Sequence, residues 1–205
     1  NEICLEVSSL SGETKEPFKD INFILSKGEI LGIAGVEGNG QRELTESILG
    51  IYPLSQGTIT VDGINIDNMA TRQRRSLGIN FIPEDRQTQG LVMDNSLIEN
   101  AMLGRQNKDM YKTRFKSVNF KNSRKFSNKI IDQYDVRTPN SSTLALALSG
   151  GNQQKFVVGR ELEDNPSLLV ASQPTRGIDI GAQSLIWEEL RLSLIHISEP
   201  TRHSD

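Results

Sequence analysis

The sequence predicts an α/β fold in which buried strands lead into helices. Residues 30–34 form a continuous apolar run typical of a central strand, and a glycine-rich segment and then a helical pattern follow it. Residues 168–171 form a second short apolar run, after a helix that opens at residues 148–151. Residues 18–25 alternate apolar and polar side chains, which indicates an antiparallel strand with one solvated face.

Composition narrows the class of protein. The chain has 205 residues, enough for one domain with a sizeable core, and 36% hydrophobic with 24% charged residues indicate a soluble globular protein. The net charge of −3 argues against a dedicated nucleic-acid binder. The single Cys4 cannot form an internal disulfide, which fits a reducing compartment. No apolar run approaches the roughly 20 residues that span a bilayer, and no secretory signal is visible.

The two ends of the sequence carry separate expectations. The chain begins at Asn1 rather than Met, so we expect a fragment of a longer protein. Residues 193–205 resemble a translated sequencing adapter, and we expect them to be a non-native tail. The only histidines, His196 and His203, lie in this tail and are not candidates for catalysis.

The amino-terminal third predicts mostly strands. Residues 3–7 suit a strand, and the polar residues 11–19 suit a loop. Residues 57–66 predict a hairpin, because two β-rich arms flank an Asp-Gly turn. Residues 71–75 are basic and suit a solvated helix face, and residues 77–82 give another apolar strand.

A glycine-rich segment between a strand and a helix predicts a phosphate-binding loop. Glycines permit unusual dihedral angles there, and successive N–H groups point at an anion at the helix start. Compared with G-x-x-x-x-G-K-[ST], however, Gln41 replaces the lysine and Arg42 replaces the metal-binding hydroxyl. Each lost charge-assisted hydrogen bond is worth about 1.5–3 kcal/mol, although Arg42 could restore some positive charge. The candidate phosphate-binding residues are Gly35, Gly38, Asn39, Gly40, Gln41 and Arg42.

Residues 96–147 read as mostly helical. Ser96 and Glu99 have the spacing of a capping box at a helix start. Eight Lys or Arg against one Asp lie between residues 108 and 129, which suits either a partner-contacting or membrane-proximal face or simply a solvated helix. The apolar residues Phe126, Ile130, Ile131 and Tyr134 recur at helical spacing and are expected in the core.

Three motifs are packed together near the carboxyl end. Leu148-Ser149-Gly150-Gly151 opens a helix, a buried strand follows at 168–171, and a Gly-x-Asp turn ends at Asp179. This arrangement resembles the signature motif, Walker B strand and D-loop of ABC-type ATPases. The resemblance covers about residues 3–192. It implies a P-loop NTPase fold of the ABC type with a mixed central sheet, an antiparallel β subdomain and a helical subdomain at about 96–147. It also implies that further strands belong after residue 192.

A narrower resemblance is to the carboxyl half of a tandem ATPase subunit from bacterial importers of simple sugars or nucleosides. It rests on IPEDR at 82–86, NQQK at 152–155 and LLVASQPTRGIDIGA at 168–182. In that family two halves meet head to tail, and each ATP lies between the phosphate loop of one half and the LSGG of the other.

The resemblance divides the site residues between two ATP sites. Ser149, Gly150 and Gly151 are intact and imply a contribution to the partner half's site, beside Asn152, where many members have glutamine. In the chain's own site, Ser172 and Gln173 stand where the family has the metal-binding aspartate and the catalytic glutamate. No catalytic residue is intact there and no metal ligand is expected, since Gln173 has no carboxylate to act as a base.

Further implications concern the surroundings of the site. Glu84 sits where the family carries a glutamine that senses magnesium and the attacking water and contacts the membrane subunit, and Asp179 belongs to the D-loop. Phe18 is either the adenine-stacking aromatic or a core residue. The family's switch histidine lies beyond the Walker B strand, in a segment that we expect to be replaced by the non-native tail.

The resemblance implies ATP as ligand, with Mg²⁺ at the partner half's site. The implied partners are a second ATPase half, membrane permease subunits and, indirectly, a solute-binding protein, without nucleic acid. The implied location is peripheral, at the cytoplasmic face of a bacterial plasma membrane. Two alternatives stay open, namely an independently active ABC ATPase and a non-transport ABC protein that acts on nucleic acid through the basic stretch at 108–129.

Overall fold

The computed structural model describes residues 2–12, 18–35, 38–106, 108–112 and 118–176, and residues 178, 181, 183, 184, 186–188, 190 and 191. Asp179 and the expected tail at 193–205 lie outside the described residues. The chain divides into two compact units, residues 1–80 with 189–205, and residues 81–188.

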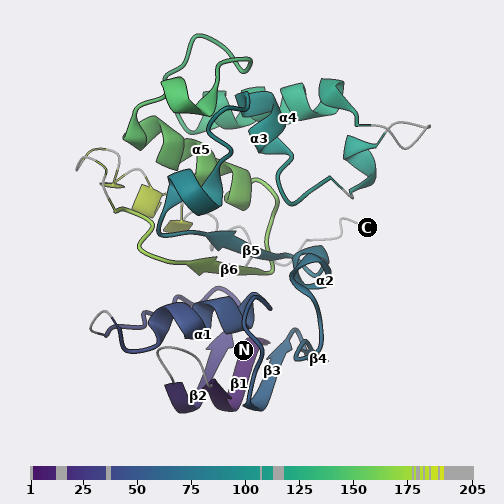
Figure 1. Cartoon of the computed structure of the whole chain (residues 1–205), viewed down its shortest axis with the longest axis vertical. Coiled ribbons are helices and arrows are strands. Elements are labelled where there is room, and N and C mark those ends of the chain that lie inside the picture. Colours follow the sequence, from purple (N-terminus) through teal and green to yellow (C-terminus); the bar gives the residue numbers. More distant parts are fainter. Residues whose placement is uncertain are drawn as a thin grey trace, which may run out of the picture. The chain divides into compact units, whose positions relative to one another are not determined.

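The first unit is built on a four-stranded antiparallel sheet in the order β2-β1-β3-β4 (Figure 1). Its strands are β1 Ile3–Gly12, β2 Phe18–Ser26, β3 Gln56–Val61 and β4 Ile64–Asn65. The core side chains Leu10 and Ile59 come from β1 and β3 and are fully buried. The predicted strands at 3–7 and 18–25 are confirmed, but the predicted loop at 11–19 was too long, because β1 keeps its pairing with β2 as far as Gly12.

The predicted hairpin is confirmed in detail. Asp62 and Gly63 have φ values of 48° and 75°, so both lie in the left-handed region. Two consecutive residues of this kind form the turn whose twist matches that of a pair of antiparallel strands. The local sequence therefore sets the register of β3 against β4, which pairs Val61 with Ile64.

Residues 30–34 correct a prediction, because they form no strand in the structure. Ile30 and Ile33 are 57% and 54% exposed, whereas a central strand would bury both. A strand needs a neighbour to pair its N–H and C=O groups, and the described strands give this segment none. An apolar run alone therefore did not suffice to predict a sheet position here.

Two helices belong to the first unit. α1 Gln41–Ile48 begins at the glycine-rich segment, as predicted, and α2 Thr71–Ser76 occupies the basic stretch. The expectation of a wholly solvated basic face was wrong for Arg74, which is 3% exposed. Its guanidinium donates to the carbonyl oxygens of Ser47 at 2.7 Å and Ile48 at 2.9 Å. These carbonyls end α1 and lack partners within the helix, so the arginine caps α1 from a distant position in the sequence.

The second unit combines a small sheet with helices (Figure 1). Strands β5 Ile79–Ile82 and β6 Leu168–Ala171 are hydrogen-bonded neighbours. The predicted strand at 168–171 is confirmed, but within it Leu168 alone is buried and Ala171 is exposed. The α-helices are α3 Leu97–Ala101, α4 Phe120–Gln133 and α5 Gly150–Leu162. One π-helical turn spans Arg86–Gly90, and short 3₁₀ turns span Asp109–Tyr111 and Ala145–Ala147.

Helices α4 and α5 approach each other closely. A Cβ atom on Gly159 of α5 would lie 2.6 Å from the ring of Tyr134, so only glycine fits at this crossing. Ile130 and Tyr134 are buried as predicted, whereas Phe126 and Ile131 are half-buried. The capping box at the start of α3 is also confirmed, since the Ser96 N–H donates to the Glu99 carboxylate at 2.8 Å.

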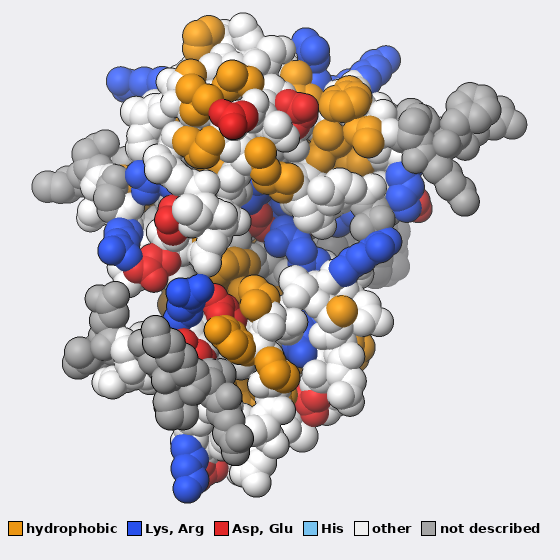
Figure 2. Space-filling view, in the orientation of Figure 1, with side chains coloured by type: hydrophobic (Ala, Val, Ile, Leu, Met, Phe, Trp, Pro, Cys, Tyr) orange, Lys and Arg blue, Asp and Glu red, His pale blue; other side chains and the backbone are white. Residues whose placement is uncertain are grey.

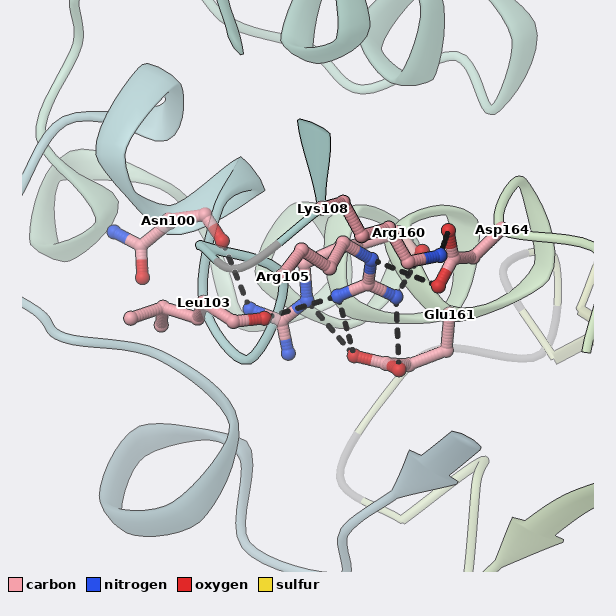
Figure 3. A network of polar contacts seen from close by, with 7 residues as sticks. All are labelled: Asn100, Leu103, Arg105, Lys108, Arg160, Glu161 and Asp164. Atoms are coloured by element: carbon pink, nitrogen blue, oxygen red, sulfur yellow. Dashed lines mark hydrogen bonds and ion pairs between the residues drawn. The ribbon is translucent and has the colours of Figure 1, made fainter. Parts of the chain in front are cut away.

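A buried ionic network lies between the end of α3 and the end of α5 (Figure 3). Arg105 is 1% exposed and donates to both carboxylate oxygens of Glu161, at 3.0 and 3.5 Å. Arg160 pairs with the same carboxylate at 2.9 Å and donates to the Asn100 carbonyl at 3.1 Å. Asp164 lies 3.3 Å from Arg105 Nε. Buried charges of this kind persist only because they are paired.

Hydrophobic side chains also reach the surface of the second unit (Figure 2). Among its described residues, the most exposed large hydrophobic side chains are Phe120 at 54%, Leu146 at 50% and Met110 at 48%. Among the described residues, no helix is both long and apolar enough to span a membrane.

Phe18, whose role was left open, is 7% exposed and packs against Gly12, which favours the core alternative.

Candidate functional site

The glycine-rich segment of the first unit forms an open helix start. Gly38 and Gly40 have φ values of 90° and 82°, which only glycine adopts without strain. No side chain caps α1 at Gly40 in the described part of the chain. The first-turn amides can therefore serve an anion, which is the backbone half of a phosphate-binding loop.

The side chains at this helix start fit an anion poorly. Gln41 lies against Gly35, since a Cβ atom built on Gly35 would overlap Gln41 Nε2. Gln41 thus brings a neutral amide where a lysine would bring a charge. Arg42 pairs with Glu46 at 2.8 Å along the helix, and this hydrogen bond raises the pKa of the guanidinium. Arg42 therefore has a carboxylate partner within α1, while 68% of its side chain is exposed.

Glu43 is a residue of this segment that sequence reasoning missed. Its side chain lies in the first turn of α1 and is 6% exposed, and its Oε2 has no hydrogen-bond partner among the described residues. A carboxylate in the first turn can itself use the positive end of the helix dipole and so competes with a bound phosphate.

The signature segment of the second unit holds its serine in a defined orientation. Ser149 is the N-cap of α5 and is exposed. Its Oγ accepts from the Asn152 side-chain Nδ2 at 3.0 Å and from the Asn152 N–H at 3.5 Å. Because both lone pairs of Oγ are occupied, its proton stays available for donation outward. Gly150 and Gly151 add backbone N–H groups at the helix start.

Asn152 orients this serine and is itself fixed. Its Oδ1 accepts from the backbone N–H of Arg137 at 2.9 Å, while its Nδ2 donates to Ser149. Both ends of the side-chain amide are thus engaged within the chain. Asn152 thus supports the position of Ser149 within the chain.

The loops that follow β5 and β6 are tied together. Glu84 after β5 forms an ion pair with Arg176 after β6, and Arg86 Nη1 donates to the Arg176 carbonyl at 3.0 Å. Gln173 is exposed, with a left-handed φ of 45°, and the Ser172 N–H donates to the Ile82 carbonyl at 2.9 Å. Glu84 is therefore engaged within the chain.

Two buried glutamines of α5 connect these loops to the signature helix. Sequence reasoning noted both within NQQK at 152–155 but gave neither this role. Gln153 Oε1 accepts from Arg86 Nε at 3.4 Å and from Gln87 Nε2 at 3.2 Å. Gln154 Nε2 donates to the Pro174 carbonyl at 2.7 Å. The signal available in the sequence was the pair of adjacent glutamines near the start of the helix, before its apolar residues Phe156 and Val157.

The side chains at the predicted site positions differ in the ligands that they could bind. Ser149 with the amides of Gly150 and Gly151 suits a phosphate oxygen. Gln41, Ser172 and Gln173 stand at positions where the resemblance predicts a lysine, an aspartate and a glutamate, and none of them carries the charged oxygen that Mg²⁺ prefers. The described residues contain no group of three or more His, Cys, Asp or Glu that could hold a metal ion.

A P-loop cassette with a signature helix defines the class of protein. A family model for ABC transporters matches residues 18–176, and the chain therefore belongs to the ABC transporter family. It is 44% identical over 178 residues to the guanosine import ATP-binding protein NupO of Bacillus subtilis, a match that covers 85% of this chain and 34% of that protein. It is 39% identical over 189 residues to the ribose import ATP-binding protein RbsA of Clostridium perfringens, covering 92% and 37%.

Solved structures confirm the fold class. A dimeric ATP-binding cassette, MJ0796, in a post-hydrolysis state with ADP and Pi, superposes with a TM-score of 0.76 at 20% identity, covering 94% of this chain and 84% of that one. The ADP form of MJ1267 gives a TM-score of 0.75 at 21% identity, covering 96% and 79%. At such identities the likeness concerns the fold alone. The chain spans about a third of the length of the curated relatives that it matches, 34% for NupO.

Proposed function

We propose that this chain is one ATP-binding half of an ABC importer for simple sugars or nucleosides. Its signature segment completes the ATP site of a partner half, and its own site is degenerate and impaired in hydrolysis. The solute class comes from the relatives, whose names specify import of guanosine, glucose, galactose and ribose.

The orientation of Ser149 carries the proposal. An exposed N-cap serine whose lone pairs are both occupied presents a hydroxyl donor, with two further amides, to an anion outside its own unit. A donor of this kind acts on the phosphate charge that develops during transfer. The ATP that it serves, with its Mg²⁺, belongs to the partner half.

The own-site residues support the other part of the proposal. Gln41 supplies no charge, Arg42 is held by Glu46, and Gln173 has no basic oxygen to accept a proton from water. Glu84, at the position of the sensing glutamine, is engaged by Arg176. Each change alone weakens hydrolysis, and together they remove charge stabilisation, metal binding and the general base.

The partners and location follow from the same proposal. An importer half works with a second ATPase half and with permease subunits, and indirectly with a solute-binding protein, and it lies peripherally at the cytoplasmic face of the membrane. Glu84 and Asp179 are proposed as residues of the nucleotide-sensing loop and the D-loop, respectively.

The test is the ATPase rate of the assembled transporter with Ser149→Ala in this half. We expect kcat to fall about a hundredfold, as for the loss of one donor to a developing oxyanion. Ser142→Ala is the matched control, because Ser142 is exposed in the segment before the signature and should leave the rate unchanged. An unchanged rate with Ser149→Ala would overturn the proposal, and magnesium-dependent hydrolysis by this half alone would favour an independently active ATPase.

A further inference from the structure

Gln153 is a buried polar side chain of the signature helix whose amide contacts two separate segments of the chain. It is 2% exposed and lies four residues after the N-cap Ser149. Its Nε2 donates to the carbonyl oxygens of Ala145 at 3.1 Å and Leu148 at 3.2 Å. Leu148 immediately precedes Ser149, so the amide fixes the backbone that carries the signature serine.

The other end of the same amide is held by the loop after β5. Gln153 Oε1 accepts from Arg86 Nε and Gln87 Nε2, both in the π-helical turn that begins at Arg86. Arg86 in turn donates to the Arg176 carbonyl, and the Arg176 guanidinium pairs with Glu84. A continuous chain of polar contacts therefore runs from Glu84 and Arg176 through Arg86 to the segment before Ser149.

A planar amide with four contacts transmits displacement in both directions. If the loop after β5 moves, Arg86 displaces Gln153 Oε1, to which it donates. The two N–H groups of Gln153 Nε2 then transmit this displacement to the carbonyls of Ala145 and Leu148. A shift of one ångström at a phosphate donor suffices to change the rate of a positioned reaction by about a hundredfold. The network therefore links the loop that carries Glu84 to the donor geometry of Ser149.

We propose that Gln153 is a positioning residue which, through Arg86, couples the Glu84–Arg176 ion pair to the placement of Ser149. The proposal rests on the proposed function, because Ser149 must act on the partner half's ATP. It predicts that Gln153 and Arg86 control the rate of turnover at the partner site but not its affinity for ATP, because both act through the backbone that carries Ser149 rather than on the nucleotide.

The experiment measures kcat and KM for MgATP in the assembled transporter. We expect Gln153→Met and Arg86→Ala each to lower kcat about tenfold, as for the loss of one or two hydrogen bonds, with KM changed by less than about twofold. The double variant should be no slower than Gln153→Met alone, because both residues act through one link. Gln133→Met and Arg124→Ala are matched controls at exposed positions of α4 and should behave as the wild type.

The outcomes separate this inference from the proposed function. If Ser149→Ala stops turnover while Gln153→Met and Arg86→Ala keep the wild-type kcat, the coupling is wrong and the proposed function stands. Additive losses in the double variant would also overturn the coupling. If Gln153→Met does not fold, the half-buried Arg86 still provides the test, since Arg86→Ala leaves the contacts of Gln153 with Ala145 and Leu148 intact.

Discussion

Gln41 lies against Gly35 in the glycine-rich segment, so closely that a Cβ atom on Gly35 would overlap Gln41 Nε2. The contact places a neutral amide in the loop whose backbone is otherwise shaped for phosphate. The backbone of this segment thus suits a phosphate, whereas the Gln41 side chain supplies no charge to bind one. The glycine-rich motif can therefore be recognised although it lacks the charge of the lysine.

Gln41→Lys should strengthen ATP binding by this half. A lysine at the start of α1 adds charge-assisted hydrogen bonds of about 1.5–3 kcal/mol, which corresponds to about tenfold to hundredfold tighter binding. The measurement is equilibrium binding of ATP to the transporter with the partner half's site blocked. Gln56→Lys, which adds the same charge at an exposed position of β3, controls for net charge. Equal affinities of the two variants would contradict the role given to residue 41.

Asn152→Asp should reverse the direction of the hydrogen bond between Ser149 and residue 152. An aspartate has no Nδ2 donor, so the Ser149 hydroxyl turns its proton toward the carboxylate and away from the ligand. We expect the partner-site kcat to fall about tenfold or more with Asp, and less with Ala, which leaves the hydroxyl free to rotate. Steady-state hydrolysis by the assembled transporter measures the difference. Asn128→Asp on the exposed side of α4 is the control, and a smaller loss with Asp than with Ala would refute the hydroxyl geometry.

Arg105→Met should destabilise the protein by about 3–5 kcal/mol, because it leaves Glu161 buried with a weaker set of partners. Arg160 still pairs with Glu161, which places the expected loss toward the lower end of that range. Replacing both Arg105 and Glu161 by methionine should cost less than the sum of the single changes. Urea unfolding monitored by circular dichroism provides the free energies, and simple additivity would show that the two residues are not coupled.

The free energy of unfolding should decrease as the pH falls, because ionised Glu99 stabilises the capping box of α3. Hydrogen bonds from the Ser96 hydroxyl and N–H lower the pKa of Glu99 from its usual value of 4.5. A depressed pKa means that the carboxylate stabilises the folded state above pH 4.5, and this contribution disappears as pH falls through the lower folded-state value. Glu99→Gln should lower the melting temperature at pH 7 by an amount that shrinks as the pH falls below 4.5. A difference independent of pH would show that ionisation of Glu99 plays no part.

Sequence reasoning succeeded where the deciding interactions are local. The turn at Asp62 and Gly63, the capping box of Ser96 and Glu99, and the start of α5 at Ser149 each depend on residues within a few positions of one another. These features follow from dihedral preferences and hydrogen bonds that the sequence itself contains.

Sequence reasoning failed where the structure depends on residues that are far apart in the sequence. Residues 30–34 are apolar enough for a strand, but strand formation depends on a neighbour that no local pattern shows. Arg74 sits in a basic run, yet it is buried because the carbonyls that end α1 lie beside it. Gln153 joins segments some 67 residues apart, from Arg86 to α5, so its contacts were equally invisible in the sequence.

The central claim is that the two ATP sites of the assembled transporter are unequal, and the most direct measurement substitutes the signature serine of each half in turn. The account predicts that Ser149→Ala in this half lowers the rate of ATP hydrolysis about a hundredfold. The equivalent change in the partner half, whose signature would face this chain's degenerate site, should lower it by less than about twofold. Equal losses, or a larger loss from the partner's serine, would contradict the account.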